Sequence, residues 1–231
     1  MVDIIKSDNS LELAKEIEVT VYINGLPSHL MCSPNNLEEL AIGFVVSEGL
    51  IDRDLVDEIE IHRKGNEIFV DVDANSFTLE LRSSGCVGVF KKGEVLPPVE
   101  AKEKFSLDEL KKALEYIDVE EYRKTRGYHS SAIVGKKGLI VRAIDVGRHN
   151  AVDKAIGMAL RKNIDTSKVF LLISGRISRG IAAKAVRSGI PLVVSKASIL
   201  DSAIDVCKKT GLSAVSFASD LIVKGDAIDL G

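Results

Sequence analysis

The second half of the chain alternates short apolar strands with helical stretches, and this alternation limits the possible folds more than any other feature. Strands are expected at residues 139–144, 169–173, 192–195 and about 214–217. Helical patterns begin at Asn150 and near residues 181–188 and 202–210. Such a succession predicts an α/β fold whose parallel or mixed sheet is covered by helices on both faces. Ligands of such sheets bind where the strands end.

The first half has a different pattern. Apolar and polar residues alternate over residues 16–24, and a helical repeat over residues 37–45 ends before Gly49. Further strands are expected at residues 58–62, 67–72 and 77–81, followed by a loop of small residues at 83–88 that contains Cys86. Ser106 and Glu109 have the spacing of a capping box that opens a helix reaching about Ile117.

We therefore expect two parts. Residues 1–100 form a smaller N-terminal α+β segment with the Cys86 loop, and residues 101–231 form a three-layer α/β/α domain with a mixed sheet. With 45% apolar and 28% charged residues, the chain is typical of globular proteins that fold without disulfide bonds or structural metal ions.

Composition also limits the kinds of partner and the cellular compartment that we expect. A net charge of −3, spread along the chain, gives no basic coat for nucleic acid or for a membrane surface. The first ten residues carry charges and lack the apolar core of a signal peptide, and no apolar run approaches the roughly 18 residues of a membrane span. The three cysteines are odd in number and far apart, which favours a reducing compartment. We expect a cytoplasmic protein.

The densest group of polar residues follows the strand at 139–144. Asp145, Arg148, His149, Asn150 and Lys154 lie together there, and Asn150 with Asp153 is expected to cap the helix. A helix start beside an arginine suits a phosphate or another anion, because free amides and a planar guanidinium both donate to it. A plain helix cap with a solvated arginine and a hydrogen-bonded histidine explains the same residues equally well.

Two further strand ends repeat this arrangement. Ser174, Gly175 and Arg176 follow one strand, and Ser195 and Lys196 follow the next. Cations at three neighbouring strand ends predict a nucleotide or pterin-phosphate pocket. His129 could join this edge or could be a hydrogen-bonded core histidine.

Cys86 is the candidate for chemistry that needs a thiol. A thiol in a small-residue loop is accessible to a partner protein, and Arg82, Lys91 and Lys92 are cations nearby in sequence. An ordinary loop cysteine is the plainer alternative. Cys32 follows an apolar pair and Cys207 follows Val206 on a helix, so both are expected to be buried and structural.

The sequence lacks the motifs of several known kinds of binding and catalytic site. The chain has no P-loop motif, no zinc-deaminase motif and no pair of cysteines at zinc-ligand spacing, so we expect no bound metal. Acid–base chemistry by paired carboxylates stays open, since 34 acidic residues offer no means of choosing a pair.

Three segments resemble signatures of the FdhD family, in the family's order: residues 40–51, 145–154 and 174–178. Residues 22–25 and 189–195 are also similar, and the likeness runs from about residue 17 to 217. The resemblance implies a sulfur carrier, which is a sulfurtransferase that accepts sulfur from a cysteine desulfurase as a persulfide on Cys86. The sulfur would pass to the molybdenum or tungsten bis-guanine-dinucleotide cofactor before formate dehydrogenase receives it. The resemblance also implies a cytidine-deaminase-like fold and a homodimer.

Combined with the strand-end argument, the resemblance gives a cofactor-binding set of His129, Asp145, Arg148, His149, Asn150, Lys154, Ser174, Gly175, Arg176, Ser195, Lys196 and Phe217. The chain departs from the family in its loop, where Cys86 is the one cysteine of a motif that commonly has two. It also departs at Arg126 in the segment before His129 and in the tail after Phe217. Two alternatives are a chaperone that binds the molybdopterin guanine dinucleotide without sulfur chemistry, and a small-molecule enzyme on the same scaffold.

Overall fold

The main sheet lies at the centre of the molecule and is mixed. The computed structural model describes residues 11–71 and 95–231. The sheet has six strands in the order β11 (Leu221–Val223), β10 (Ser213–Ser216), β9 (Leu192–Ser195), β8 (Phe170–Ile173), β6 (His129–Gly135) and β7 (Gly138–Asp145). Strands β8, β9 and β10 are parallel, whereas β6 is antiparallel to both of its neighbours. The predicted mixed α/β sheet is confirmed.

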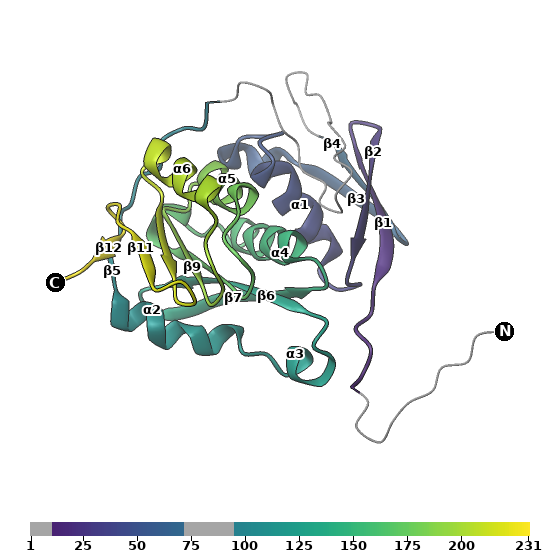
Figure 1. Cartoon of the computed structure of the whole chain (residues 1–231). Helices are drawn as coiled ribbons and strands as arrows, with labels where there is room; N and C mark the ends of the chain where they lie inside the picture. The colour runs from purple at the N-terminus through teal and green to yellow at the C-terminus, as the bar shows by residue number, and fades with distance from the viewer. Residues whose placement is uncertain (1–10, 72–94) are drawn as a thin grey trace.

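Helices cover both faces of this sheet (Figure 1). One face packs against α4 (Arg148–Leu160), α5 (Arg179–Arg187) and α6 (Asp201–Thr210), and the other against α2 (Leu107–Ala113) and the 3-10 turn η2 (Leu114–Ile117). Consecutive strand residues alternate between the two cores, as the pleat requires: Leu171 faces one core and Leu172 the other. The three-layer α/β/α arrangement is therefore confirmed.

A smaller sheet covers the helical layer from outside. Its order is β2 (Leu26–Cys32), β1 (Ile17–Ile23), β4 (Glu67–Asp71) and β3 (Glu60–Lys64), with β1 parallel to β4. Its inner residues pack on α1 (Leu37–Ser47) in the same buried cluster that contains α4. The two predicted segments thus meet through one continuous core.

The remaining elements connect these layers. They are η1 (Arg53–Glu58), α3 (Glu120–Thr125), η3 (Thr166–Lys168) and the short pair β5 (Phe105–Ser106) with β12 (Ile228–Asp229). Ser106 and Glu109 form the predicted capping box, in which each side chain accepts from the other residue's backbone N–H. No helix in the described ranges is long and apolar enough to cross a membrane.

Helices α1 and α4 approach each other unusually closely because each contributes a glycine to the contact. A Cβ atom at Gly43 would lie 1.8 Å from the carbonyl oxygen of Asp153, and one at Gly157 would lie 2.0 Å from that of Glu39. Both opposing atoms belong to backbone, which cannot rotate away as a side chain can. The spacing of the two helices therefore requires glycine at both positions.

Most predicted elements are present, with shifts of one or two residues at their ends. The helix expected from Asn150 begins two residues earlier, at Arg148. Strands β2 and β6 were not predicted, and β6 separates β7 from β8, so the three strand ends expected to be neighbours are not all adjacent. The strand at 77–81 and the Cys86 loop lie outside the described residues.

Gly43→Ala should destabilise the protein. The added methyl group must push α1 away from α4, and overpacking of this kind costs about 1–3 kcal/mol, more than the roughly 1 kcal/mol gained in helix propensity. Urea unfolding would measure the change. Gly65→Asn is the control, because its turn has open space around it and asparagine tolerates the positive φ; equal stability of the two variants would contradict the argument.

Candidate functional site

The predicted site residues gather at one edge of the main sheet. Strands β7, β8 and β9 all end there, and β6 begins there because it runs in the opposite direction. His129 at the start of β6 pairs with Asp145 at the end of β7, and Ser174 follows β8. The antiparallel strand thus places His129 in the gap between two strand ends, as one of the two open interpretations predicted.

Asp145 organises the turn that leads into α4. The carboxylate is fully buried and forms an ion pair with Lys154 Nζ at 2.6 Å. Its oxygens also accept hydrogen bonds from the backbone N–H of Ser33 at 3.0 Å and of Gly147 at 2.8 Å, and from Asn150 Nδ2 at 3.1 Å. Lys154 Nζ also donates to the Ser33 carbonyl, at 2.9 Å. These bonds engage Asp145 and Lys154 inside the protein.

The predicted helix cap is wrong. Gly147 occupies the N-cap position and no side chain caps the helix. Asn150 Nδ2 instead donates to the Met31 carbonyl at 2.8 Å, so it ties the helix to the end of β2. Asp153 is buried and receives hydrogen bonds from Lys184 and Ser47. Asn150 thus donates to a distant carbonyl and to Asp145, whereas Asp153 accepts from distant buried donors, so neither side chain forms the cap that sequence alone assigns to it.

Two glycines allow the site's larger side chains to lie close to the loop after β8. A Cβ at Gly175 would lie 3.3 Å from Cβ of Arg148 and 3.5 Å from Nδ1 of His129. One at Gly180 would lie 3.4 Å from Nε2 of His149. Arg148 and His129 thus lie against the loop after β8, and His149 lies against the first turn of α5.

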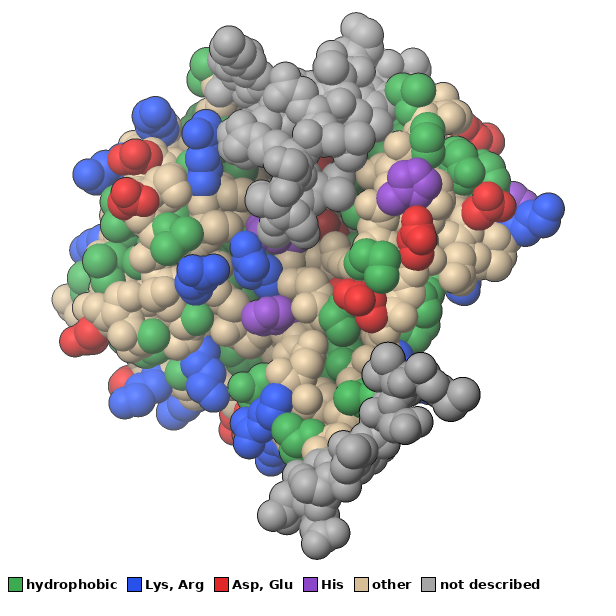
Figure 2. Space-filling view, turned by 45° about the vertical axis from the view of Figure 1, so that its right-hand side comes forward, with side chains coloured by type: hydrophobic (Ala, Val, Ile, Leu, Met, Phe, Trp, Pro, Cys, Tyr) green, Lys and Arg blue, Asp and Glu red, His purple; other side chains and the backbone are tan. Residues whose placement is uncertain are grey.

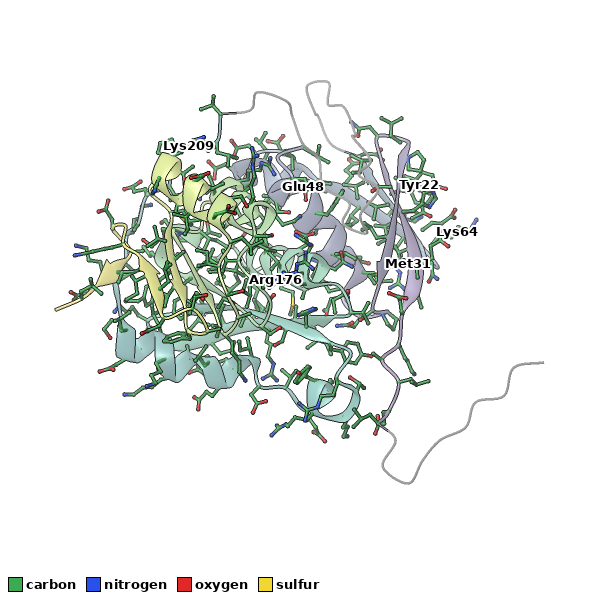
Figure 3. The ribbon with its side chains drawn as sticks, viewed as in Figure 1. Tyr22, Met31, Glu48, Lys64, Arg176 and Lys209 are labelled. Carbon is green, nitrogen blue, oxygen red and sulfur yellow. The ribbon has the colours of Figure 1, made fainter. Side chains whose placement is uncertain are left out.

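The remaining predicted residues divide into inner and outer groups. Ser174 Oγ lies 3.3 Å from His129 Nδ1, and buried Ser195 donates to the Gly175 carbonyl at 2.6 Å. Arg176 and Lys196 are exposed at the same edge, whereas Phe217 is half-buried and its N–H binds the Ser195 carbonyl. Figure 3 labels Arg176 here, and Figure 2 shows histidine, lysine and arginine side chains gathered near the middle of one face.

Both histidines of the edge favour the neutral form. Burial, with the positive charges of Lys184 and Arg148 nearby, lowers the pKa of His149 to about 3. Burial and Arg148 also lower the pKa of His129. Positive charge at the edge therefore comes from Arg148, Arg176 and Lys196, while the imidazoles can donate or accept hydrogen bonds without adding charge.

A second buried ion network underlies the site and was not predicted. Lys184 Nζ lies 2.8 Å from Asp153 Oδ1 and pairs with Glu48, while Ser47 donates to Asp153 at 2.6 Å. The network joins the C-terminal end of α1 to α4 and α5. The small residues on all sides of α4, including Ala151 and Ala155, could have indicated that this helix and its charges are buried.

The two described cysteines are poor nucleophiles. Cys32 and Cys207 are buried, as predicted, with 0% and 2% of their surface exposed. Burial raises the pKa of each thiol to about 11, and for Cys32 the Asp145 carboxylate adds to this effect. Cys86 lies outside the described residues. Within those residues, no group of three His, Cys, Asp or Glu side chains is placed to hold a metal ion.

The model of the FdhD/NarQ family matches residues 14–222. The chain belongs to this family. Its FdhD/NarQ relatives include the sulfur carrier protein FdhD of Wolinella succinogenes, which is 31% identical over 88% of this chain and 76% of its own. Protein FdhD of Methanocaldococcus jannaschii is 31% identical over 89% and 84%.

One solved structure supports the family fold. It is a protein from Desulfotalea psychrophila that is described as a formate dehydrogenase accessory protein. Its TM-score is 0.77 at 24% identity, and the match covers 94% of this FdhD/NarQ chain and 90% of the other. The three-layer core and the outer sheet together therefore form an FdhD-type fold.

His149 should make stability depend on pH. Above its ordinary pKa of about 6.5, the histidine is neutral in both states. As pH falls toward 3, the unfolded chain gains a proton that the folded protein resists, so stability is lost. Between pH 7 and 5 the melting temperature of the wild type should therefore fall further than that of His149→Gln, by about 6 °C, the shift that about 2 kcal/mol causes in a chain of this size. His29→Gln, at an exposed position on β2, should follow the wild type; parallel curves for all three proteins would show that His149 titrates normally.

Proposed function

We propose that this protein is a sulfur carrier whose Cys86 accepts sulfur from a cysteine desulfurase as a persulfide. The observation that carries this proposal is the burial of the other two cysteines. Cys32 and Cys207 have thiol pKa values of about 11, so their reactive thiolate is scarce at neutral pH. Cys86 is the remaining thiol. The relatives named sulfur carrier protein FdhD support the same role.

One thiol is sufficient for the transfer step. The Cys86 thiolate attacks the outer sulfur of the desulfurase persulfide, and a new S–S bond forms at Cys86. The S–S bond of the donor breaks at the same time, and the desulfurase cysteine leaves as a thiolate. No net oxidation takes place in this loading step, so the second cysteine common in this family's loop is not required for it.

The cargo that we propose is the molybdenum or tungsten bis-guanine-dinucleotide cofactor, which receives the sulfur before insertion into formate dehydrogenase. Arg148, Arg176 and Lys196 supply positive charge for its phosphates, and an arginine can bind a phosphate through two hydrogen bonds. His129 and His149 offer neutral hydrogen-bonding groups beside them. Asp145 and Lys154 are engaged within the protein and support the turn rather than contact the cofactor.

The resemblance implies a homodimer, and the composition predicts a cytoplasmic protein. We keep both as part of the proposal, with the desulfurase and formate dehydrogenase as the partner proteins. The accessory description of the structural relative agrees with a role beside formate dehydrogenase.

Cys86→Ala should abolish persulfide loading while the protein stays folded. The proteins would be incubated with a cysteine desulfurase and cysteine, and intact mass spectrometry would detect an added mass of about 32 Da, that of one sulfur atom, in the wild type. Cys207→Ala and Cys32→Ala are the controls, and both should load as the wild type does, because their thiols are buried. Loading of Cys86→Ala at the wild-type level would remove the residue from the mechanism.

Arg148→Ala and Arg176→Ala should each weaken binding of GDP, a probe for the nucleotide half of the cargo. Loss of one charge-assisted hydrogen-bond pair costs about 1.5–3 kcal/mol, which is roughly 10- to 150-fold in Kd. Lys209→Ala is a matched charge control on α6, away from the labelled Arg176 in Figure 3. A different set of results would favour a nucleotide-binding chaperone. In that case the arginine variants lose GDP binding, Cys86→Ala keeps it, and the wild type is not loaded with persulfide.

A further inference from the structure

We propose that Ser33 is a positioning residue for the phosphate-binding turn at residues 145–148, a role that rests on the proposed function. Ser33 follows β2 in the N-terminal segment, and only 1% of its surface is exposed. It belongs to none of the segments that suggested a binding site. Its importance follows from its hydrogen bonds.

All three polar groups of Ser33 bind the segment that carries the turn. Its N–H donates to Asp145 Oδ2 at 3.0 Å, and its hydroxyl oxygen accepts from the Val146 N–H, also at 3.0 Å. Its carbonyl accepts from Lys154 Nζ at 2.9 Å. One residue therefore holds the end of β7, the turn itself and the second helical turn of α4.

The buried ion pair makes this attachment stiff. Asp145 and Lys154 neutralise each other at 2.6 Å in a site with no exposed surface, so neither can move without leaving a buried charge unpaired. Ser33 gives each member of the pair one hydrogen bond: its N–H donates to Asp145, and its carbonyl accepts from Lys154. The hydrogen bond to Val146 is the one contact of the three that uses the serine side chain, so it can be removed without disturbing the pair.

Arg148 follows two residues after Val146, and its direction depends on the path of the turn. Phosphate binding through Arg148 and the first amides of α4 requires that these donors already point to one place. A turn that samples other conformations binds more weakly, in proportion to the fraction of molecules in the competent one. Ser33 raises this fraction by fixing the Val146 amide.

The test is the affinity of Ser33→Ala for two probes, GDP and inorganic pyrophosphate. Loss of one buried hydrogen bond should weaken each by about fivefold, as expected for roughly 1 kcal/mol. The two factors should be equal, because the turn binds phosphate and not the base. An unchanged affinity for both probes overturns the proposal, as does a loss confined to GDP.

Two serine and threonine variants separate positioning from general stability. Ser28→Ala removes a buried hydroxyl within β2 that has no hydrogen-bond partner, and it should change neither stability nor affinity. Thr210→Ala removes a buried hydroxyl that donates to the Val206 carbonyl at 2.8 Å, at the end of α6. It should lower the melting temperature by about 2–4 °C, the same fall that is expected for Ser33→Ala, without weakening pyrophosphate binding. Equal weakening in Thr210→Ala would reduce Ser33 to a stability residue and overturn the proposal.

A measurement on the unmodified protein keeps the test independent of how the variant folds. Hydrogen exchange at the Val146 amide should slow when pyrophosphate binds, and unchanged exchange overturns the inference. Wild-type protein that binds neither probe also overturns it. Persulfide loading of wild-type Cys86, measured separately, then shows whether the proposed sulfur transfer fails as well or stands alone.

Discussion

Two consecutive buried charges in the middle of α4, Asp153 and Lys154, hold the structure together in two directions. Asp153 binds Lys184 on α5 and Ser47 at the end of α1, whereas Lys154 binds Asp145 on β7 and the carbonyl after β2. An unpaired charge in such an interior costs about 3–5 kcal/mol, so both sets of partners must be present at once. The position of α4 therefore determines those of both sheets.

The glycine contact between α1 and α4 makes these short ion pairs possible. Because Gly43 allows the Asp153 carbonyl to come so near, the Asp153 carboxylate can receive the Ser47 hydroxyl at 2.6 Å. Packing and electrostatics thus select the same arrangement. The central turn of the candidate site, at residues 145–148, is therefore held in place by buried groups that are not accessible to a ligand.

Local patterns in the sequence predicted most helices and strands of this fold but few of the hydrogen bonds and ion pairs that join them. Strand and helix periodicity located most elements of the second half, and the rule for strand ends located the edge that carries Arg148 and Arg176. The prediction of the helix cap was wrong because Asn150 and Asp153 have the residue types of a cap but bind Met31 and Lys184, which are distant in sequence. Ser33 was missed for the same reason. Strand β6 was missed although it explains how His129 reaches the site.

The long-range contacts at the turn also determine the order in which the protein can become competent. The bond between Val146 and Ser33 joins residues 113 positions apart, and Ser195 and Phe217 complete the edge from still further along the chain. Contacts of such separation form late, because the intervening chain must lose its freedom first. During synthesis the Cys86 thiol leaves the ribosome well before the residues of the cationic edge. A nascent chain would therefore carry the thiol that we propose accepts sulfur before it has formed the edge that we propose binds the cofactor.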